Sequence, residues 1–506
     1  MKNRLLRFSV FALLITLSGC ASNAQNFAPA APDSPWVPRG DENTTLWSMA
    51  TTPAPVPTHT GFAIPADPSL AVLPAVPEFD ANLRYSLPQL IDIAQQNNSS
   101  TRVAWQHARQ AALAVGMVEA TYLPMLSASV VAGYQDLNSQ LPEVLGYTPN
   151  VDIRLSGAAP ILSLQWLLFD FGQREALAEA ARHMARAANV LFNGAHQQVI
   201  FAVSEAYYLY AASIERQKRV QQALNNALAI EKAVLARRKQ GLATVMETAQ
   251  ARQAVAQAQF RAVQLEGQVR DAYQVLLAAI GVQARLNIDV ASVMERPLPA
   301  PAAAPIDAMI AQALAQRPDI AASYAALQAS QAGIAAVRAG YLPKVFLAGN
   351  VALGSSSFDV ARLPSLDQQQ SGTGVVVGVT MPLFDGGLRD ARLKEAESRT
   401  QAAQDDFQRI QTAALTEIIL ARNGLTSAFE SNRAATALVA ASQTTYDAAL
   451  DAYRHGVGTV DVAQAADNAL IAAHEAQIDA RTAARVQAVK LAFALGALSS
   501  VQNLPR

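Results

Sequence analysis

Short segments in which apolar and polar residues alternate occur in pairs along the chain. The clearest are ILSLQWLLF, residues 161–169, and GTGVVVGVTMPLF, residues 372–384. Their weaker partners are LSASVVAGY, residues 126–134, and KVFLAGNVALG, residues 344–354. A period of two is typical of β-strands whose two faces have different surroundings. Each segment covers about nine to eleven residues, the length that a tilted strand needs to cross a bilayer.

Helical periodicity fills most of the remaining chain. We expect helices over residues 87–121 and 306–340, each stopped by the proline of a Tyr-Leu-Pro triplet, with Pro318 dividing the second one. After the strands come two proline-free helical stretches of 68 residues each, 173–240 and 388–455. At about 1.5 Å per residue, each would extend on the order of 100 Å.

A glycine turn ends each long helix, at Gly241 and at Gly456, and reverses the chain into a second helix of about 35 residues. The earlier helix and the return helix together match the long helix in length. We therefore expect them to lie end to end along its side. Periodic alanine and leucine with interspersed charges favour coiled-coil packing, which predicts a helical column with strands at one end.

The same elements appear twice because the sequence contains an internal repeat. Four landmarks show the spacing: TYLP and GYLP (340 − 121 = 219), the two Phe-Asp pairs (384 − 169 = 215), KQGLATV and RHGVGTV (454 − 239 = 215), and the glycines that end LLAAIG and AFALG (496 − 281 = 215). The four-residue difference places a loop between the first two landmarks. We predict two structural repeats, residues 81–285 and 300–498.

Two strands in each repeat give the chain four strands. Four strands cannot close a barrel, and lipid does not tolerate an open sheet edge, so several chains would have to share one barrel. Two, three or four chains would supply 2 × 4 = 8, 3 × 4 = 12 or 4 × 4 = 16 strands, and the sequence does not choose among them. In such a barrel Trp166 would lie in an aromatic girdle. The alternative is an edge sheet in a soluble domain.

The first twenty residues carry a targeting signal. Basic residues precede an apolar run at 8–17 and then small residues, which is typical of a secretory signal peptide over residues 1–19. The end of this segment, Leu-Ser-Gly-Cys at residues 17–20, resembles a bacterial lipoprotein cleavage box, which implies a lipid attached to Cys20. The residue after the cysteine is Ala21 and not an aspartate, which resembles the sequence of lipoproteins that are sorted to the outer membrane. The alternative is an ordinary signal peptide with an incidental cysteine.

Residues 20–80 are rich in proline, alanine and threonine without a helical or strand period, so we expect an extended segment. No later stretch reaches 18 consecutive apolar residues, which argues against helical membrane spans. The single cysteine excludes an intramolecular disulfide. Much of the 51% hydrophobic content is alanine, which favours closely packed helices.

Charge and motifs argue against several other functions. Basic and acidic side chains number 39 and 40, without a basic run, which argues against nucleic-acid binding. The six histidines show no metal-ligand spacing, and Gly386-Gly387 lacks the Lys-Ser or Lys-Thr of a phosphate-binding loop. We therefore expect no catalytic residues, no metal and no cofactor beyond the lipid on Cys20.

The combined motifs resemble a known family. Tyr-Leu-Pro, Leu-Phe-Asp-Gly-Gly and Tyr-x-x-Gly-x-x-Thr-Val-Asp-Val, in a repeated chain behind a lipoprotein box, resemble the bacterial outer-membrane efflux proteins. These are TolC-like channels, here of the lipoprotein branch of OprM and NodT type, and the resemblance covers roughly residues 80–498.

The resemblance implies a mainly α fold with a membrane β-barrel, built from a tandem-duplicated strand pair and long helical hairpins. It implies a homotrimer with a 12-stranded barrel in the outer membrane, among its lipids, and a helical barrel in the periplasm. Such a passive duct docks on a periplasmic adaptor and a proton-driven inner-membrane pump, and carries drugs or other small molecules outward. The alternatives are the outer component of a protein secretion system, or a lipid-anchored coiled-coil protein without a pore.

The resemblance also assigns roles to the glycine turns. They would be the periplasmic tips that meet the adaptor, with exposed apolar residues beside them. The alternative is that they are ordinary turns of helical hairpins with buried valines. The residues concerned are Gly241, Leu242, Val245, Gly456, Val457, Gly458 and Val460.

Tyr453 and Asp461 flank the second turn, as a tyrosine and an aspartate do in the family's closed entrance. A ring of such aspartates, one from each chain, would attract cations. This sequence is one residue shorter between the glycine and Asp461, and the family's arginine after the turn has no counterpart here. The alternative is that Asp461 is a solvated aspartate at the start of a helix.

The repeated Phe-Asp motifs have a structural interpretation. We expect each to be an elbow where a strand ends and a long helix begins. Asp170 and Asp385 are suited to accept hydrogen bonds from the first N–H groups of the helices. Gly172, Gly386 and Gly387 would let the chain bend.

Overall fold

The computed structural model describes residues 68–71, 79–80, 83–140, 150–291, 297–298, 305–360 and 366–498. The chain divides into two units, Met1–Val76 and Pro77–Arg506. In the first unit the described residues are the 3-10 helix η2 (Pro68–Ala71). The predictions of a signal peptide at 1–19 and of a lipid on Cys20 lie outside the described residues, as does most of the segment 20–80. All further description concerns the second unit.

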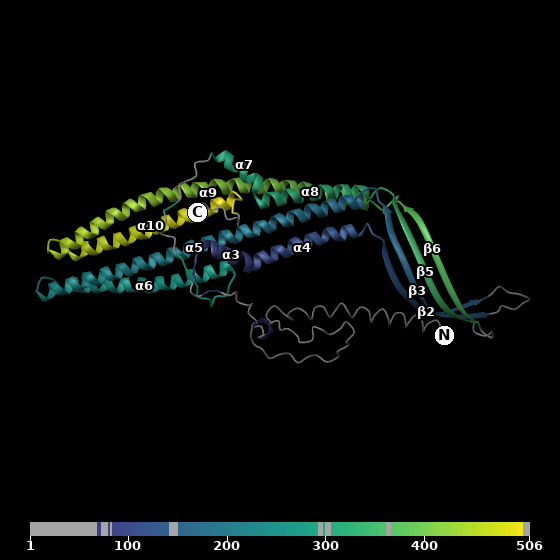
Figure 1. Ribbon diagram of the computed structural model, residues 1–506, viewed down its shortest axis with the longest axis horizontal. Helices are drawn as coiled ribbons and strands as arrows, with labels where there is room; N and C mark the ends of the chain where they lie inside the picture. Colours follow the sequence, from purple (N-terminus) through teal and green to yellow (C-terminus); the bar gives the residue numbers. More distant parts are fainter. Residues whose placement is uncertain are drawn as a thin grey trace, which may run out of the picture. The chain divides into compact units, whose positions relative to one another are not determined.

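Four long strands of this unit form one antiparallel sheet in the order β2-β3-β5-β6 (Figure 1). Each repeat contributes one hairpin, and β3 pairs with β5 to join the two repeats. Among the described residues, β2 and β6 each have one edge without a partner strand. The strands are β2 (Met125–Gln140), β3 (Asn150–Phe169), β5 (Lys344–Val360) and β6 (Leu366–Thr380).

These strands are longer than the sequence predicted. They contain 16, 20, 17 and 15 residues. The prediction stopped where the alternation of apolar and polar residues stopped. The ladder nevertheless continues through polar stretches such as LDQQQS (366–371), because main-chain hydrogen bonds maintain it whatever the side chains. At the other end, β6 stops at Thr380 rather than continuing to Phe384, because Pro382 has no N–H to donate to the ladder.

The helices begin and end close to the predicted residues. The two long ones have 67 residues each, one fewer than expected, and the return helices have 36 and 35 residues. The bounds are α3 (Leu87–Asn97), α4 (Ser99–Ala120), α5 (Gln173–Lys239), α6 (Val245–Ile280), α7 (Ile306–Gln316), α8 (Pro318–Ala339), α9 (Leu388–Arg454) and α10 (Val460–Ala494). None of the described helices is long and apolar enough to span a bilayer.

Shorter helices line the long ones in pairs (Figure 1). Helices α4 and α6 pack along α5, and α8 and α10 pack along α9, which confirms the predicted end-to-end arrangement. Helix α5 also contacts α8 and α10, so it joins the two repeats in the column as β3 joins them in the sheet. Many of the buried side chains are alanines, which lets the helix axes approach closely.

The first short helical stretch is interrupted at Asn98, where the sequence predicted one continuous helix. Asn98 has extended backbone geometry (ψ 130°), its Oδ1 accepts a hydrogen bond from the Ser100 N–H at 2.8 Å, and its Nδ2 donates to the Ala279 carbonyl at 3.0 Å. In the first repeat the helix is therefore interrupted at Asn98, which caps α4 and bonds to α6. In the second repeat the interruption is at a proline, Pro318. The predicted break at Pro318 is confirmed.

A glycine at the end of each return helix packs against these breaks. A Cβ at Gly281 would lie 2.8 Å from the Asn98 Cα, and one at Gly496 would lie 3.3 Å from the Arg317 Cα. Both glycines also have positive φ, 83° and 68°. These two contacts hold the end of each return helix against the middle of the column.

A second, small sheet was not predicted. Strand β1 (Arg84–Tyr85) pairs in parallel with β4 (Asp289–Val290), close to where the first repeat begins and ends. Tyr207 of α5 is fully buried beside it and donates a hydrogen bond to the Ala291 carbonyl. Two-residue strands carry no readable alternation, so the sequence offered no signal for them.

Candidate functional site

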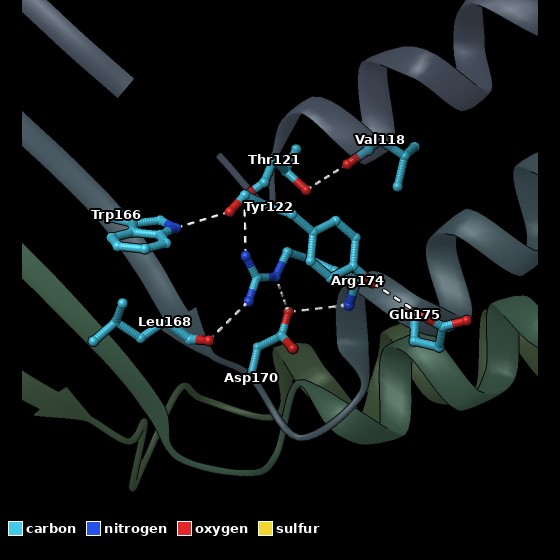
Figure 2. Close-up of polar contacts among 8 residues, drawn as sticks. All are labelled: Val118, Thr121, Tyr122, Trp166, Leu168, Asp170, Arg174 and Glu175. Atoms are coloured by element: carbon cyan, nitrogen blue, oxygen red, sulfur yellow. Dashed lines mark hydrogen bonds and ion pairs between the residues drawn. The ribbon is translucent and has the colours of Figure 1, made fainter. Parts of the chain in front are cut away.

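The first elbow is a buried polar cluster between β3, the end of α4 and the start of α5 (Figure 2). One carboxylate oxygen of Asp170 accepts hydrogen bonds from the Arg174 N–H at 3.0 Å and from Arg174 Nε at 2.9 Å. The same guanidinium donates to the carbonyls of Thr121 at 3.0 Å and Leu168 at 3.3 Å, and lies 4.5 Å from the Tyr122 ring. One arginine thus ties the end of α4, the strand end and the helix start together.

Trp166 extends this cluster along β3. Its Nε1 donates a hydrogen bond to the Tyr122 carbonyl at 2.8 Å, while the Tyr122 hydroxyl donates to Glu175 at 3.2 Å (Figure 2). The indole is therefore engaged with the turn after α4.

The second elbow has the same helix start but fewer contacts. Asp385 accepts hydrogen bonds from the Gly387 N–H and the Arg389 N–H, both at 3.2 Å, and from Arg389 Nε at 2.7 Å. The bond from the Arg389 guanidinium holds the pKa of the Asp385 carboxyl below its ordinary value. The arginine lies 4.9 Å from the Tyr341 ring. Met381 stands where the first repeat has Trp166, because 381 − 166 = 215.

Positive φ angles produce both bends. Gly172 and Gly387 have φ of 88° and 89°, and the preceding residues, Phe171 and Gly386, have φ of 52° and 64°. The first repeat therefore places a phenylalanine in a backbone region that favours glycine. The Phe171 ring lies edge-on to Phe169, with ring centroids 4.7 Å apart, which helps to hold it there.

The two hairpin tips have similar backbones and different packing. Gly241 and Gly456 have φ of 75° and 80°, as the tight reversal requires. At the first tip Thr244 and Glu247 form a capping box, whereas Thr459 makes no side-chain cap. Gly458 is needed for close packing, because a Cβ there would lie 3.1 Å from the Tyr453 main-chain nitrogen.

The expectation of an exposed Val460 is wrong. Leu242, Val245 and Val457 are exposed, by 62%, 69% and 83%, but Val460 is only 1% exposed. It packs in a core cluster with Ile230, Val234, Ala251, Tyr453 and Ala463. The reason is that α10 packs against α5 as well as against α9, so the first residue of α10 is covered from both sides.

Tyr453 and Asp461 are not brought together. Tyr453 is buried in the same cluster, and its hydroxyl is one of the buried polar atoms without a hydrogen-bond partner in the described part of the chain. Desolvation, with a smaller contribution from Glu247, raises the pKa of Tyr453. Asp461 is exposed in the first turn of α10.

The partner of Tyr453 is Arg237, which the sequence did not reveal. Arg237 Nη1 donates to the Tyr453 carbonyl at 2.9 Å, and the guanidinium lies 5.2 Å from the tyrosine ring. A Cβ at Gly456 would lie 3.2 Å from Arg237 Nη1, so the glycine leaves room for it. Because the arginine comes from the end of α5, motif matching around the second turn had no means of finding it.

Two further polar links join α5 to α10. Asn226 Nδ2 donates to Asp467 Oδ1 at 2.9 Å, and Arg216 Nε donates to Asp479 Oδ1 at 3.2 Å. Together with the contact between Arg237 and Tyr453, they connect α5 of the first helical hairpin to the second hairpin at three positions along α5. Among the described residues, no group of three or more His, Cys, Asp or Glu side chains is arranged to hold a metal ion.

A duplicated four-stranded sheet continued by paired helical hairpins defines the class of TolC-like outer-membrane channel subunits. The crystal structure of VceC from Vibrio cholerae has this fold: its TM-score is 0.67 at 20% identity, and the match covers 81% of this chain and 96% of VceC. The outer membrane efflux protein family matches residues 90–282 and 309–497. The chain belongs to this family, and it is an efflux channel protein of the outer membrane.

Two further proteins that are similar in sequence are described as outer membrane proteins. The pyoverdine export outer membrane protein OpmQ of Pseudomonas putida is 29% identical over 377 residues, which cover 71% of this chain and 75% of OpmQ. The probable outer membrane lipoprotein SilC of Salmonella typhimurium is 25% identical over 418 residues, which cover 81% of this chain and 85% of SilC. The family is one of transport channels and not of enzymes.

Proposed function

We propose that the chain forms a homotrimeric duct that closes one 12-stranded barrel, since 3 × 4 = 12. The observation that carries this proposal is the four-stranded sheet with two free edges. The strands alternate in direction, so β6 of one subunit is antiparallel to β2 of the next, and the alternation continues around a closed ring. Closure satisfies the edge N–H and C=O groups that lipid cannot.

Exposed apolar side chains on the helices support the same assembly. Phe260 and Val263 of α6 are 68% and 67% exposed, and Leu420 of α9 is 61% exposed. Helix α6 packs against α5, and α9 packs against α10, which leaves α6 and α9 on opposite sides of the packed series α6-α5-α10-α9. Contact between α6 of one subunit and α9 of the next would cover these residues and continue the helices into a periplasmic barrel.

The duct is passive and receives its cargo from partners. Its substrates are drugs or other small molecules, which the name of the pyoverdine exporter OpmQ supports. A periplasmic adaptor and a proton-driven inner-membrane pump supply the cargo and the energy. No cofactor takes part, and the lipid on Cys20 anchors the chain to the outer membrane, which is supported by the likeness to the lipoprotein SilC. The two structural repeats, 81–285 and 300–498, build the wall of the duct.

The adaptor docks at the hairpin tips. Leu242, Val245 and Val457 present apolar side chains beside the Gly241 and Gly456–Gly458 turns. The elbows at Asp170–Gly172 and Asp385–Gly387 set the direction of the helices that carry these tips. Contact with the adaptor would bury the exposed side chains.

The entrance is held closed by the contact between Arg237 and Tyr453. It links the first hairpin to the second directly beside the tips, so opening the entrance would require this link to break. Asp461, exposed in the first turn of α10, would form a ring of three carboxylates, one from each subunit, that attracts cations to the entrance.

The test uses the full-length protein purified in detergent. Native mass spectrometry is expected to give three chains, and planar bilayers are expected to show ion conductance. Arg237→Ala should increase the conductance because the link at the entrance is lost, whereas Arg238→Ala, at the exposed neighbouring residue, should leave it unchanged. A monomer with no conductance would contradict the duct and favour a coiled-coil protein without a pore. Transport of a polypeptide by the intact system would favour secretion.

A further inference from the structure

A polar cavity of about 230 Å³ lies between α5, α6 and α10, above the hairpin tips. Its floor on α5 is formed by apolar and small residues, among them Val220 and Ala223. Its walls on α6 and α10 are rich in amides, among them Gln253, Gln257 and Gln464. A cavity of this size and polarity holds water, so groups that line it can exchange protons with the solvent.

Asp467 of α10 lines this cavity and is 7% exposed. Its partner is an amide, Asn226 of α5, which donates to Oδ1 at 2.9 Å. Among the described residues, no lysine, arginine or histidine forms an ion pair with Asp467. Burial raises the pKa of its carboxyl, against the smaller opposing effect of the Asn226 hydrogen bond. A buried carboxylate that has no cationic partner is costly to keep ionised.

The other ionisable groups near Asp467 do not stabilise its ionised form. Arg261 of α6 and Asp461 of α10 line the same cavity, and Arg261 is not within ion-pair distance of the carboxylate. Tyr446 of α9 is 6% exposed, and burial together with the charge on Asp467 raises its pKa to about 12. Tyr446 therefore stays neutral over the whole range in which a carboxyl titrates, and Asp467 is the group at this position whose charge changes.

We propose that Asp467 is a proton-binding residue that makes closure of the duct depend on pH. The proposal rests on the proposed duct and on the links between its two hairpins. When Asp467 is neutral, α10 packs against α5 without burying a charge, and the closed arrangement is favoured. When Asp467 is ionised, separating α10 from α5 exposes the carboxylate to water and removes that cost. Opening breaks the bond to Asn226 as well as the contact between Arg237 and Tyr453.

The sign of the effect follows from linkage. The closed state has the higher pKa at Asp467, so it binds the proton more tightly, and acid favours closure. The effect develops as the pH falls through that raised pKa, and it is complete below the ordinary carboxyl pKa of about 4. Each unit by which the closed-state pKa exceeds the open-state pKa changes the ratio of closed to open states by up to about tenfold for each subunit.

The experiment records full-length channels in planar bilayers between about pH 7.5 and pH 3.5, a range above and across the ordinary carboxyl pKa. The wild-type protein should close progressively as the pH falls. Asp467→Asn, which is neutral at every pH, should show the low open probability of the acidic wild-type channel throughout. Asp447→Asn is the matched control: it removes an exposed carboxylate of α9, next to Tyr446, and should keep the pH dependence.

A second variant tests the direction of the shift. Asn226→Ala removes a hydrogen bond that favours the ionised carboxylate in the closed arrangement, so the closed-state pKa of Asp467 rises and the difference in open probability between neutral and acidic pH should become larger. The proposal is overturned if the wild-type channel does not respond to pH, if Asp467→Asn responds as the wild type does, if Asp447→Asn abolishes the response, or if Asn226→Ala reduces the difference in open probability between neutral and acidic pH. Absence of conductance in every protein at every pH would instead contradict the proposed duct.

Discussion

Arg174 and Arg389 occupy equivalent positions in the two repeats, because 389 − 174 = 215, but their surroundings differ. The side chains of Arg174 and Asp170 are 8% and 7% exposed, and the guanidinium also bonds to two carbonyls. Arg389 and Asp385 are 17% and 24% exposed. The preceding Leu383 and Phe384 are 87% and 90% exposed. One motif therefore forms a buried junction inside the sheet and a more open one at its edge.

This difference predicts unequal effects of removing the two arginines. Arg174→Ala leaves the buried Asp170 carboxylate without its ionic partner, so it should destabilise the folded chain by about 3–5 kcal/mol. Arg389→Ala should have a clearly smaller effect, because water reaches Asp385. Thermal unfolding of the detergent-solubilised variants would compare them. Equal losses of stability would contradict the assignment of Arg174 as the central residue of the first elbow.

At the scale of elements, the two helical hairpins have the same length and unlike neighbours. Helix α10 packs against both α9 and α5, whereas α6 packs mainly against α5. Val245 and Val460 show the consequence, since 460 − 245 = 215 and both begin a return helix. Val245 is 69% exposed and Val460 is 1% exposed. Local sequence placed both valines beside a turn, but the packing of α10 against α5 buries only one of them.

Substitution by aspartate separates these two environments. Val460→Asp places an uncompensated charge in a packed cluster and should cost about 3–5 kcal/mol in unfolding free energy, as unpaired buried charges do. Val245→Asp should leave unfolding nearly unchanged but weaken binding of the adaptor, which can be measured with the purified proteins. Loss of stability from Val245→Asp, or adaptor binding as strong as that of the wild type, would contradict the docking role of the first tip.

At the scale of the whole molecule, the proposed contact with further copies of the chain would cover both the free edges of the sheet and the exposed apolar residues of α6 and α9. The strands also need surroundings that suit their apolar faces. Val375, Val377 and Val379 share one face of β6 and are 76%, 64% and 67% exposed in the single chain. In a closed barrel this face would contact lipid.

A charge on this face tests the barrel. Val377→Lys should hinder membrane insertion by about 2–4 kcal/mol, the cost of a basic side chain on the lipid-facing side of a barrel near the bilayer midplane. Gln369→Lys, at an exposed polar position of the same strand, should have little effect. The measurement is the fraction of protein recovered as heat-resistant trimer in the outer-membrane fraction. Equal recovery of the two variants would argue against lipid contact at Val377.

The sequence by itself determined the elements and their duplication. Helix lengths, glycine turns and the proline break at Pro318 follow from local periodicity and backbone chemistry, which a linear sequence records directly. The elbows were also readable, because Asp170 and Asp385 act on residues four positions away.

The tertiary structure decided which residues at equivalent positions of the two repeats have different surroundings. The burial of Val460, the partnership of Arg237 with Tyr453 and the capping of the break by Asn98 each depend on a helix distant in the sequence. Tertiary packing likewise placed Asp467 against Asn226, which lies 241 residues away along the chain. Periodicity shows that a helix has a face to bury, but only the packed structure shows which neighbour covers it, and that neighbour determines burial, charge and pairing.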